Sequence, residues 1–191
     1  MSTLMFARAV TGRPVVTLGG DDIAQVKDVV FGSEDAAVRC FTLSGRRLLS
    51  GPLRQVLAWQ DVYALGQDAV MVRDENALTE DVATGTATGA GGGNVVGAQV
   101  ISDEGVSLGR ITDVIIELGD DARARVVGYE IEQSRSVWKR RKRLLLPAPG
   151  HTAASGETVV VPSMAMQYTT EDLAGLAEAA HRLSTRLEEN R

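Results

Sequence analysis

An internal repeat is the feature that most constrains how this chain of 191 residues can fold. Three pairs of segments match in the same order, and the first pair aligns without a gap. They are residues 12–31 (GRPVVTLGGDDIAQVKDVVF) with 97–116 (GAQVISDEGVSLGRITDVII), 38–43 (VRCFTL) with 126–131 (VVGYEI), and 67–72 (QDAVMV) with 156–161 (GETVVV). One structural unit used twice is therefore expected, and we refer to the two copies as the first and second repeat.

Each repeat alternates short apolar runs with glycine-containing turns, which is the pattern of short β-strands with tight connections. Gly20 and Gly105 fall between apolar runs, where glycine supplies the positive φ that such a turn needs. Cys40 lies in the alternating stretch VRCFTL, which predicts a packed thiol on a strand. A repeat has too few residues for covering helices, so we expect its sheet to curl into a small barrel that removes exposed edges.

The two repeats share the order G-x-x-V, G-x-x-(L/I)-(G/A)-x-(V/I)-x-D-V and a Val-rich strand, and the first continues with QVLAWQDVYALGQDAVMV at residues 55–72. This ordered set resembles the PRC-barrel family, named for the cytoplasmic domain of the photosynthetic reaction-centre H subunit. The resemblance implies a mainly β fold, with two small PRC-type β-barrels in tandem and a C-terminal α-helix. It also implies an adaptor or regulatory module.

The segment between the repeats is rich in Gly, Thr and Ala and has no apolar periodicity, which predicts a flexible linker. The expected division is a first PRC-barrel at residues 1–75, a linker at 76–94, a second PRC-barrel at 95–168 and an amphipathic helix at 169–191. No lysine followed by Ser or Thr comes after the linker glycines, which argues against a phosphate-binding loop.

The C-terminal segment changes to helical periodicity. Its apolar residues recur every three or four positions, at Leu173, Leu176, Ala180, Leu183 and Leu187. Thr169 is expected to cap the helix, with Asp172 three residues later. The apolar stripe suits packing on the second barrel, and it also suits a short dimerisation seam that would make a homodimer; the spacing leaves both interpretations open.

Catalytic residues do not form a recognisable set. Asp28 and Asp113 recur at matching positions, but neither has a second carboxylate, a histidine or a nucleophile beside it in the pattern, so we interpret both as hydrogen-bonding residues of turns or strand ends. His151 and His181 lie in a loop and a helix and do not suggest a metal site. The sequence therefore predicts no enzyme, no cofactor and no metal.

The most distinctive charged stretch is VWKRRKRLLLP at residues 137–147, in a chain whose formal net charge is −5. We expect a β-hairpin in which Arg143 lies opposite Glu130 and Arg141 opposite Glu132. The basic residues that remain, with one aromatic, define a candidate binding patch. Its members are Trp138, Lys139, Arg140 and Lys142.

These observations favour a non-enzymatic interaction or adaptor module that binds a protein partner through its barrels. No apolar run is long enough to span a membrane and no signal peptide is visible, so we expect a cytoplasmic location. Two alternatives use the basic hairpin at residues 138–143: binding of RNA or a ribosome-associated site, and peripheral association with an anionic membrane or membrane complex. The charged stretch itself is equally consistent with a solvated hairpin tip.

Overall fold

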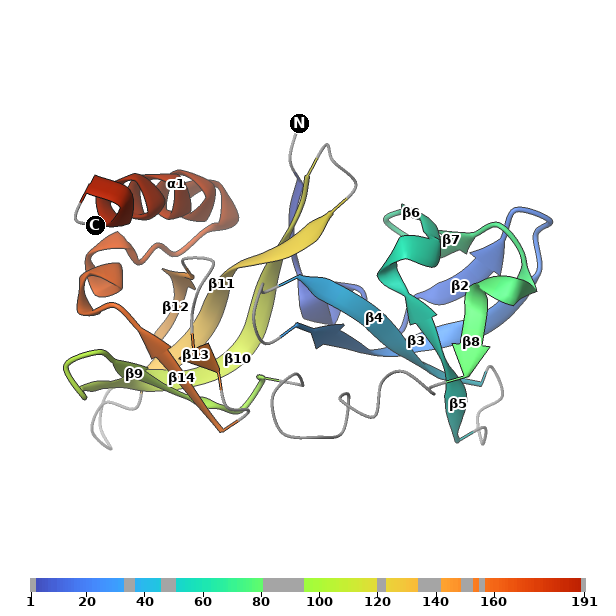
Figure 1. Cartoon of the computed structure of the whole chain (residues 1–191), viewed down its shortest axis with the longest axis horizontal. Coiled ribbons are helices and arrows are strands. Elements are labelled where there is room, and N and C mark those ends of the chain that lie inside the picture. The colour runs from blue at the N-terminus through green and yellow to red at the C-terminus, as the bar shows by residue number, and fades with distance from the viewer. Residues whose placement is uncertain are drawn as a thin grey trace.

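Two seven-stranded sheets and one C-terminal helix make up the protein in a computed structural model (Figure 1). The structure describes residues 3–32, 37–45, 51–80, 95–119, 123–133, 142–148, 153–154 and 157–189. Each sheet is strongly curled, like half of a barrel (Figure 1). The expected mainly β fold with two PRC-type units and a C-terminal helix is confirmed.

The first sheet has the strand order β6-β7-β2-β3-β4-β5-β8. Its strands are β2 (Pro14–Thr17), β3 (Asp22–Phe31), β4 (Val38–Ser44), β5 (Pro52–Ala58), β6 (Val62–Leu65), β7 (Val70–Val72) and β8 (Leu78–Glu80). Two short 3-10 helices, η2 (Trp59–Asp61) and η3 (Glu75–Ala77), connect its later strands.

The second sheet has the order β12-β11-β10-β9-β14-β13, and β1 pairs with β10 beside this path. Its strands are β1 (Thr3–Phe6), β9 (Gln99–Ser102), β10 (Ser107–Leu118), β11 (Ala124–Gln133), β12 (Lys142–Pro147), β13 (Ala153–Ala154) and β14 (Thr158–Val161). The 3-10 helices η1 (Ala7–Ala9) and η4 (Ser163–Tyr168) follow β1 and β14, and α1 (Leu173–Glu189) ends the described chain.

Matching main-chain hydrogen bonds occur at matching positions of the two repeats. The Gly12 N–H donates to the Val26 carbonyl and the Gly97 N–H donates to the Ile111 carbonyl, both at 2.8 Å. In each repeat the first strand also pairs in parallel with the last matching strand, β2 with β7 and β9 with β14. The same sequence pattern therefore produces the same connection twice, because both copies place glycine and apolar residues at the positions where the strands must turn and pair.

Alternate residues of the strands in both sheets are buried and form the core. Phe41 in β4 and Tyr129 in β11 are matching buried aromatics, and Leu57 and Leu146 are their fully buried strand neighbours. The predicted packed thiol is also confirmed, since Cys40 is a buried residue of β4 without a disulfide.

The N-terminal strand crosses from one repeat to the other. β1 precedes the first repeat in sequence, yet it pairs antiparallel with β10 of the second, with Thr3 opposite Leu118 and Phe6 opposite Ile115. β8, in the segment expected to be linker, pairs with β5 of the first sheet. The remaining expected linker, residues 81–94, lies outside the described residues, and the domain boundaries stay a prediction.

The helix α1 packs on the second sheet, which is one of the two arrangements that the sequence left open. Leu176 joins Ile115 and Leu145 in a buried cluster, and Leu183 belongs to the main core. A dimerisation seam along this stripe would first require the helix to leave its own sheet. The expected cap at Thr169 is wrong: the helix begins at Leu173, and the Asp172 carboxylate accepts the Gly175 N–H at 2.7 Å. Among the described residues, no helix has both the length and the apolar character needed to cross a membrane.

Gly109 marks a place where the second sheet tolerates no side chain. It follows a bulge in β10, has φ of +146°, and a Cβ there would lie 2.6 Å from the Glu132 carbonyl oxygen. Ala24 occupies the matching place in the first repeat and is fully buried. The two repeats therefore differ in how closely their central strands approach each other.

We expect Gly109→Ala to lower the free energy of unfolding by about 1–3 kcal/mol, because the new Cβ meets backbone and the positive φ becomes strained. Urea unfolding followed by far-ultraviolet circular dichroism measures the change. Gly51→Ala is the matched control, since a Cβ there meets nothing within 4 Å and no positive φ is involved. Equal stability of the two variants would contradict the close approach at Gly109.

Candidate functional site

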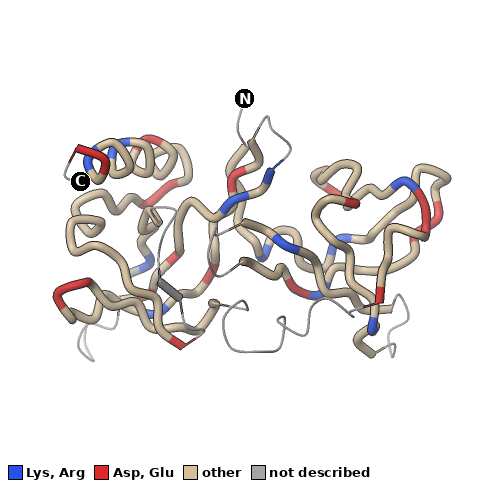
Figure 2. The backbone as a smooth tube through the Cα atoms, viewed as in Figure 1, with Lys and Arg blue, Asp and Glu red and all other residues tan. Residues whose placement is uncertain are grey.

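The predicted basic patch falls largely outside the described residues. This applies to Trp138, Lys139 and Arg140, whereas Lys142 is placed by its main chain at the start of β12, opposite Gln133. Elsewhere in the described part of the chain, acidic and basic positions are spread over both halves of the molecule (Figure 2). The patch remains a prediction.

The predicted register of the hairpin is wrong by two residues. Arg143 lies opposite Glu132, and Glu130 lies opposite Leu145. A shift of two residues keeps each side chain on its own face of the sheet, so Leu146 lies on the core side in either register; in the observed one it is fully buried opposite Tyr129. Arg143 nevertheless reaches Glu130 diagonally, with Nη1 4.0 Å from Oε1. Arg141, the other predicted partner, lies outside the described residues.

A buried ion cluster is the most developed polar arrangement in the described structure. Arg8 of η1 places Nη1 2.7 Å from Glu130 Oε2 and Nε 3.2 Å from Asp113 Oδ2. Its main-chain N–H also donates to Asp113 Oδ1 at 3.2 Å, and the Thr112 hydroxyl donates to Glu130 Oε2 at 2.7 Å. Phe6 supports the guanidinium from one side, with its ring centroid 4.4 Å from the Arg8 Cζ atom.

Asp113 is a hydrogen-bonding residue, as expected, because its carboxylate accepts main-chain N–H groups from Val114 and Arg8, but it lies inside β10 and not at a turn or strand end. The expectation that no two carboxylates lie together is wrong, since Arg8 joins Asp113 to Glu130. Asp28, the counterpart of Asp113, pairs instead with Thr42, whose hydroxyl accepts the Asp28 N–H at 3.1 Å.

Arg8 was not predicted from the sequence because it precedes the repeat. One sequence feature, Glu130, nevertheless indicates that a cationic partner is needed. The aligned repeats place Glu130 where the first repeat has Thr42, between buried neighbours on a central strand. A carboxylate at such a position requires a cationic or multiple hydrogen-bonding partner. That partner is Arg8, in the segment before the repeat.

The surroundings shift the pKa values of the two carboxyl groups in opposite directions. Burial raises the pKa of Asp113 above its ordinary value of 3.8, and the main-chain donors only partly oppose this effect. Burial acts on Glu130 in the same direction, but hydrogen bonds from Arg8 and Thr112 outweigh it and lower the pKa of Glu130 below 4.5. The side chains of Asp113 and Glu130 are 2% and 7% exposed, whereas that of Arg8 is 51% exposed, so the carboxylates are buried beneath the arginine and the cluster ties the N-terminal segment to β10 and β11.

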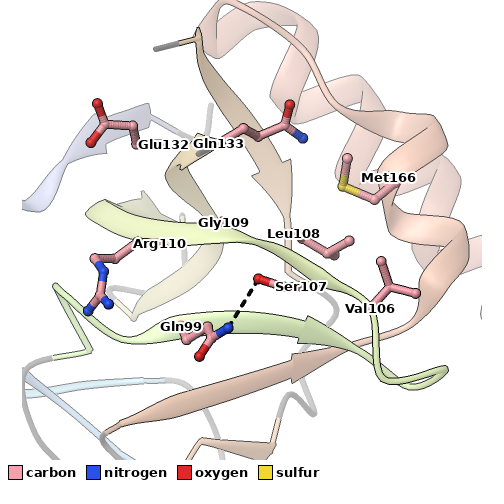
Figure 3. Close-up of a pocket in the computed structure, with 9 residues that line it drawn as sticks. All are labelled: Gln99, Val106, Ser107, Leu108, Gly109, Arg110, Glu132, Gln133 and Met166. Atoms are coloured by element: carbon pink, nitrogen blue, oxygen red, sulfur yellow. Dashed lines mark hydrogen bonds between the residues drawn. The ribbon is translucent and has the colours of Figure 1, made fainter. Parts of the chain in front are cut away.

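An open cavity of about 390 Å³ lies at the mouth of the second sheet (Figure 3). Its apolar side is formed by Val106, Leu108 and Met166, and Gln99 donates a hydrogen bond to the Ser107 hydroxyl at 3.1 Å on the polar side. The cavity lining contains no histidine, cysteine or paired carboxylate. This arrangement can bind a small group but offers no acid–base pair.

Metal-binding residues are not gathered anywhere in the described ranges, where no group of three His, Cys, Asp or Glu side chains is close enough to hold an ion. His181 is exposed on α1, and His151 lies outside the described residues. These placements give neither histidine a metal partner in the described part.

Comparison with known families identifies the fold of the first repeat. Residues 2–78 match the PRC-barrel domain, so the chain carries a domain of this family over that range. Domains of the family are generally non-catalytic interaction or scaffold modules. No curated protein matches the chain. The likeness of the second repeat to the same fold rests on its sequence match and its shared strand pairing with the first.

The ion cluster makes the stability of the protein depend on pH in two opposing ways. The stabilising contribution of ionised Glu130 is complete above its ordinary pKa of 4.5 and is lost as the pH falls through the lower folded value. For Asp113 the folded pKa is raised, so ionisation costs stability, and acidification removes that cost.

We expect Glu130→Gln to lower the free energy of unfolding at neutral pH by about 1–3 kcal/mol, because Arg8 and Thr112 lose an ionised acceptor. Below pH 4.5, Glu130→Gln should lose less stability on acidification than the wild type, and Asp113→Asn should lose more. Urea unfolding at a series of pH values measures both slopes. Arg182→Gln is the control, since its exposed pair with Glu178 on α1 is 3.9 Å long and belongs to neither carboxylate, and unchanged slopes in both carboxylate variants would refute the assignment.

Proposed function

We propose that this protein is a non-enzymatic cytoplasmic adaptor that binds a protein partner with its two PRC-type units acting as one body. The observation that carries the proposal is the crossing of β1 and Arg8 from the first repeat to β10 and β11 of the second. A flexible tether would let each unit bind separately, whereas this crossing gives the partner one composite surface.

Further contacts support a fixed junction. Ala37, just before β4, forms an antiparallel bridge with Arg125 of β11, and residues of both repeats belong to one continuous buried cluster. A preorganised surface loses less conformational entropy on binding than two units that must first be oriented. Stable protein interfaces bury about 1,200–2,000 Å² in total, an area more easily supplied by two adjacent units than by one.

We also propose that the protein has no catalytic role, because its two buried carboxylates already have partners within the chain. Asp113 and Glu130 are both engaged by Arg8 and by hydrogen-bond donors. Both carboxylates therefore stabilise the fold. The open cavity beside β10 lacks, among its described lining residues, a pair suited to proton transfer. RNA or ribosome binding, and membrane association, remain alternatives that depend on the patch Trp138, Lys139, Arg140 and Lys142.

Affinity capture with the full-length tagged protein, followed by mass spectrometry, tests the proposal. We expect one protein partner at constant stoichiometry, and we expect ribonuclease treatment and Lys139→Gln/Arg140→Gln/Lys142→Gln to leave it bound. Arg8→Ala should reduce capture several-fold by loosening the junction, whereas Arg143→Ala is the control and should not.

Other outcomes would replace the adaptor proposal. Ribonuclease-sensitive material that disappears in the triple glutamine variant would indicate nucleic-acid binding through the basic hairpin. Flotation of the purified protein with phosphatidylserine vesicles at low salt would indicate the membrane alternative. Conversion of a small molecule by the purified protein would contradict a non-enzymatic role.

A further inference from the structure

The outer strands of the two sheets differ in how well they are protected against pairing with another chain. The strand orders end in β6 and β8 for the first sheet and in β12 and β13 for the second. β12 has two basic residues, and its Leu145 exchanges two main-chain hydrogen bonds with Thr170. β8 ends on Glu80, and β13 has only two residues. Charges, short length and pairing with a nearby segment are all features that keep a sheet edge from accepting another strand.

β6 (Val62–Leu65) has none of these features. Its four residues, VYAL, carry no charge, and it pairs with β7 on one side only within the described part of the chain (Figure 1). Tyr63 is 54% exposed and Ala64 is also exposed, so the middle of the strand is not covered. Valine and tyrosine favour the extended conformation. An edge of this kind is a template for a further strand, which would bind mainly through main-chain hydrogen bonds.

The same edge is too irregular for open-ended association. The register of β6 on β7 shifts between Val62 and Ala64, which leaves Tyr63 at a bulge. Bulges increase the local twist of a strand and oppose the stacking of long sheets edge to edge. The Arg73 guanidinium lies over the Tyr63 ring, with Cζ 5.3 Å from the ring centroid. The edge therefore suits one short strand and not a continuous sheet.

This edge belongs to the first repeat. β6 precedes β7 and pairs antiparallel with it, as β13 precedes β14 and pairs with it in the second repeat. The second copy of the edge strand is therefore the two-residue β13, which is half as long. The repeats share the connection but differ in the length of edge that they offer to another chain.

The surroundings of β6 favour a basic side chain in the added strand. A cavity of about 440 Å³ lies beside the start of β6, between η2 and η3. Its charged lining residues are Asp61, Arg73 and Asp74, so two carboxylates face one guanidinium. The Asp74 carboxylate also accepts the Asn76 N–H at 2.8 Å, which fixes its position at the start of η3. A lysine or arginine beside the first residue of β6 would meet net negative charge.

We propose that β6 accepts an extended segment of a partner protein as an additional strand of the first sheet, with a basic side chain of that segment towards Asp61 and Asp74. The inference rests on the proposed adaptor function and names the chemistry of its partner. A second copy of this chain fits less well, because its own β6 brings no basic residue and is flanked by Asp61 and Asp68.

A synthetic strand tests the proposal with the full-length protein. The probe is a capped, fluorescein-labelled peptide of alternating valine and threonine with one lysine near an end. Its control is the same peptide with alternate main-chain nitrogens methylated, which removes the hydrogen bonds and keeps the side chains. We expect saturable binding of the probe by fluorescence anisotropy, and no binding of the methylated control. Hydrogen–deuterium exchange should show new protection at residues 62–65 and none at residues 78–80.

Charge variants test the role of the cavity beside β6. Replacing the lysine of the probe by glutamine should weaken binding about 2–5-fold, as expected for an exposed ion pair. Asp61→Asn should weaken binding of the lysine probe by a similar factor. Glu188→Gln is the matched control, because it removes one negative charge from an exposed position on α1, and it should leave the affinity unchanged. Equal weakening by both variants would indicate a general charge effect and would contradict a basic contact at Asp61.

A lysine placed on the edge strand tests the location. Ala64→Lys should weaken probe binding at least ~10-fold, because edge lysines oppose pairing with a further strand. Thr79→Lys is the matched control: it adds the same charge at an exposed position of β8, the other outer strand of this sheet, and should change the affinity by less than ~2-fold. If thermal unfolding shows that Ala64→Lys is not folded, the methylated probe and the exchange pattern of the wild type decide the question.

Other results would overturn the inference. Equal binding of the probe and its methylated control would exclude main-chain pairing, and protection at residues 78–80 in place of 62–65 would assign the strand to β8. A dimer of the wild type that Ala64→Lys dissociates, measured by sedimentation velocity, would mean that a second copy occupies the edge. A partner captured equally by the wild type and by folded Ala64→Lys would refute the role of β6 while leaving the adaptor function intact.

Discussion

The pairing of β1 with β10, secured by Arg8 between two buried carboxylates, determines how the two halves of the molecule are joined. Burying carboxylates without a cation would cost several kcal/mol, so Asp113 and Glu130 make the N-terminal segment necessary to the second sheet. Arg8 itself is half exposed, which means that the cluster sits at a surface seam between repeats. The bridge from Ala37 to Arg125 is a second contact between the two repeats.

The two repeats keep matching core residues, such as Phe41 and Tyr129, and differ in what packs on their sheets. Gly128 stands where the first repeat has Cys40, and a Cβ at Gly128 would lie 2.8 Å from the Leu146 carbonyl and 3.0 Å from Leu176. Absence of a side chain there lets α1 approach the second sheet closely. The repeats therefore share a fold and differ in what covers it.

The described surface is better suited to binding another molecule than to catalysing a reaction. The buried side chains of Asp113 and Glu130 join separate segments, and the open cavity beside β10 is lined by polar, charged and apolar side chains. An arrangement of this kind supports recognition of another chain, where shape and charge at a rim select the partner. The match of residues 2–78 to the PRC-barrel domain agrees with such a role.

The sequence by itself determined the repeat, the mainly β fold, the buried thiol of Cys40 and the apolar stripe of the C-terminal helix. These are local features, because strand alternation, turn glycines and helical spacing act over a few residues. The register between β11 and β12 was less accessible, because charge pairing and face alternation are compatible with registers two residues apart, and the observed one places Arg143 opposite Glu132. Only the tertiary structure placed β1 in the second sheet and brought Arg8 to residues more than a hundred positions away, because these contacts join parts of the chain that are far apart in sequence.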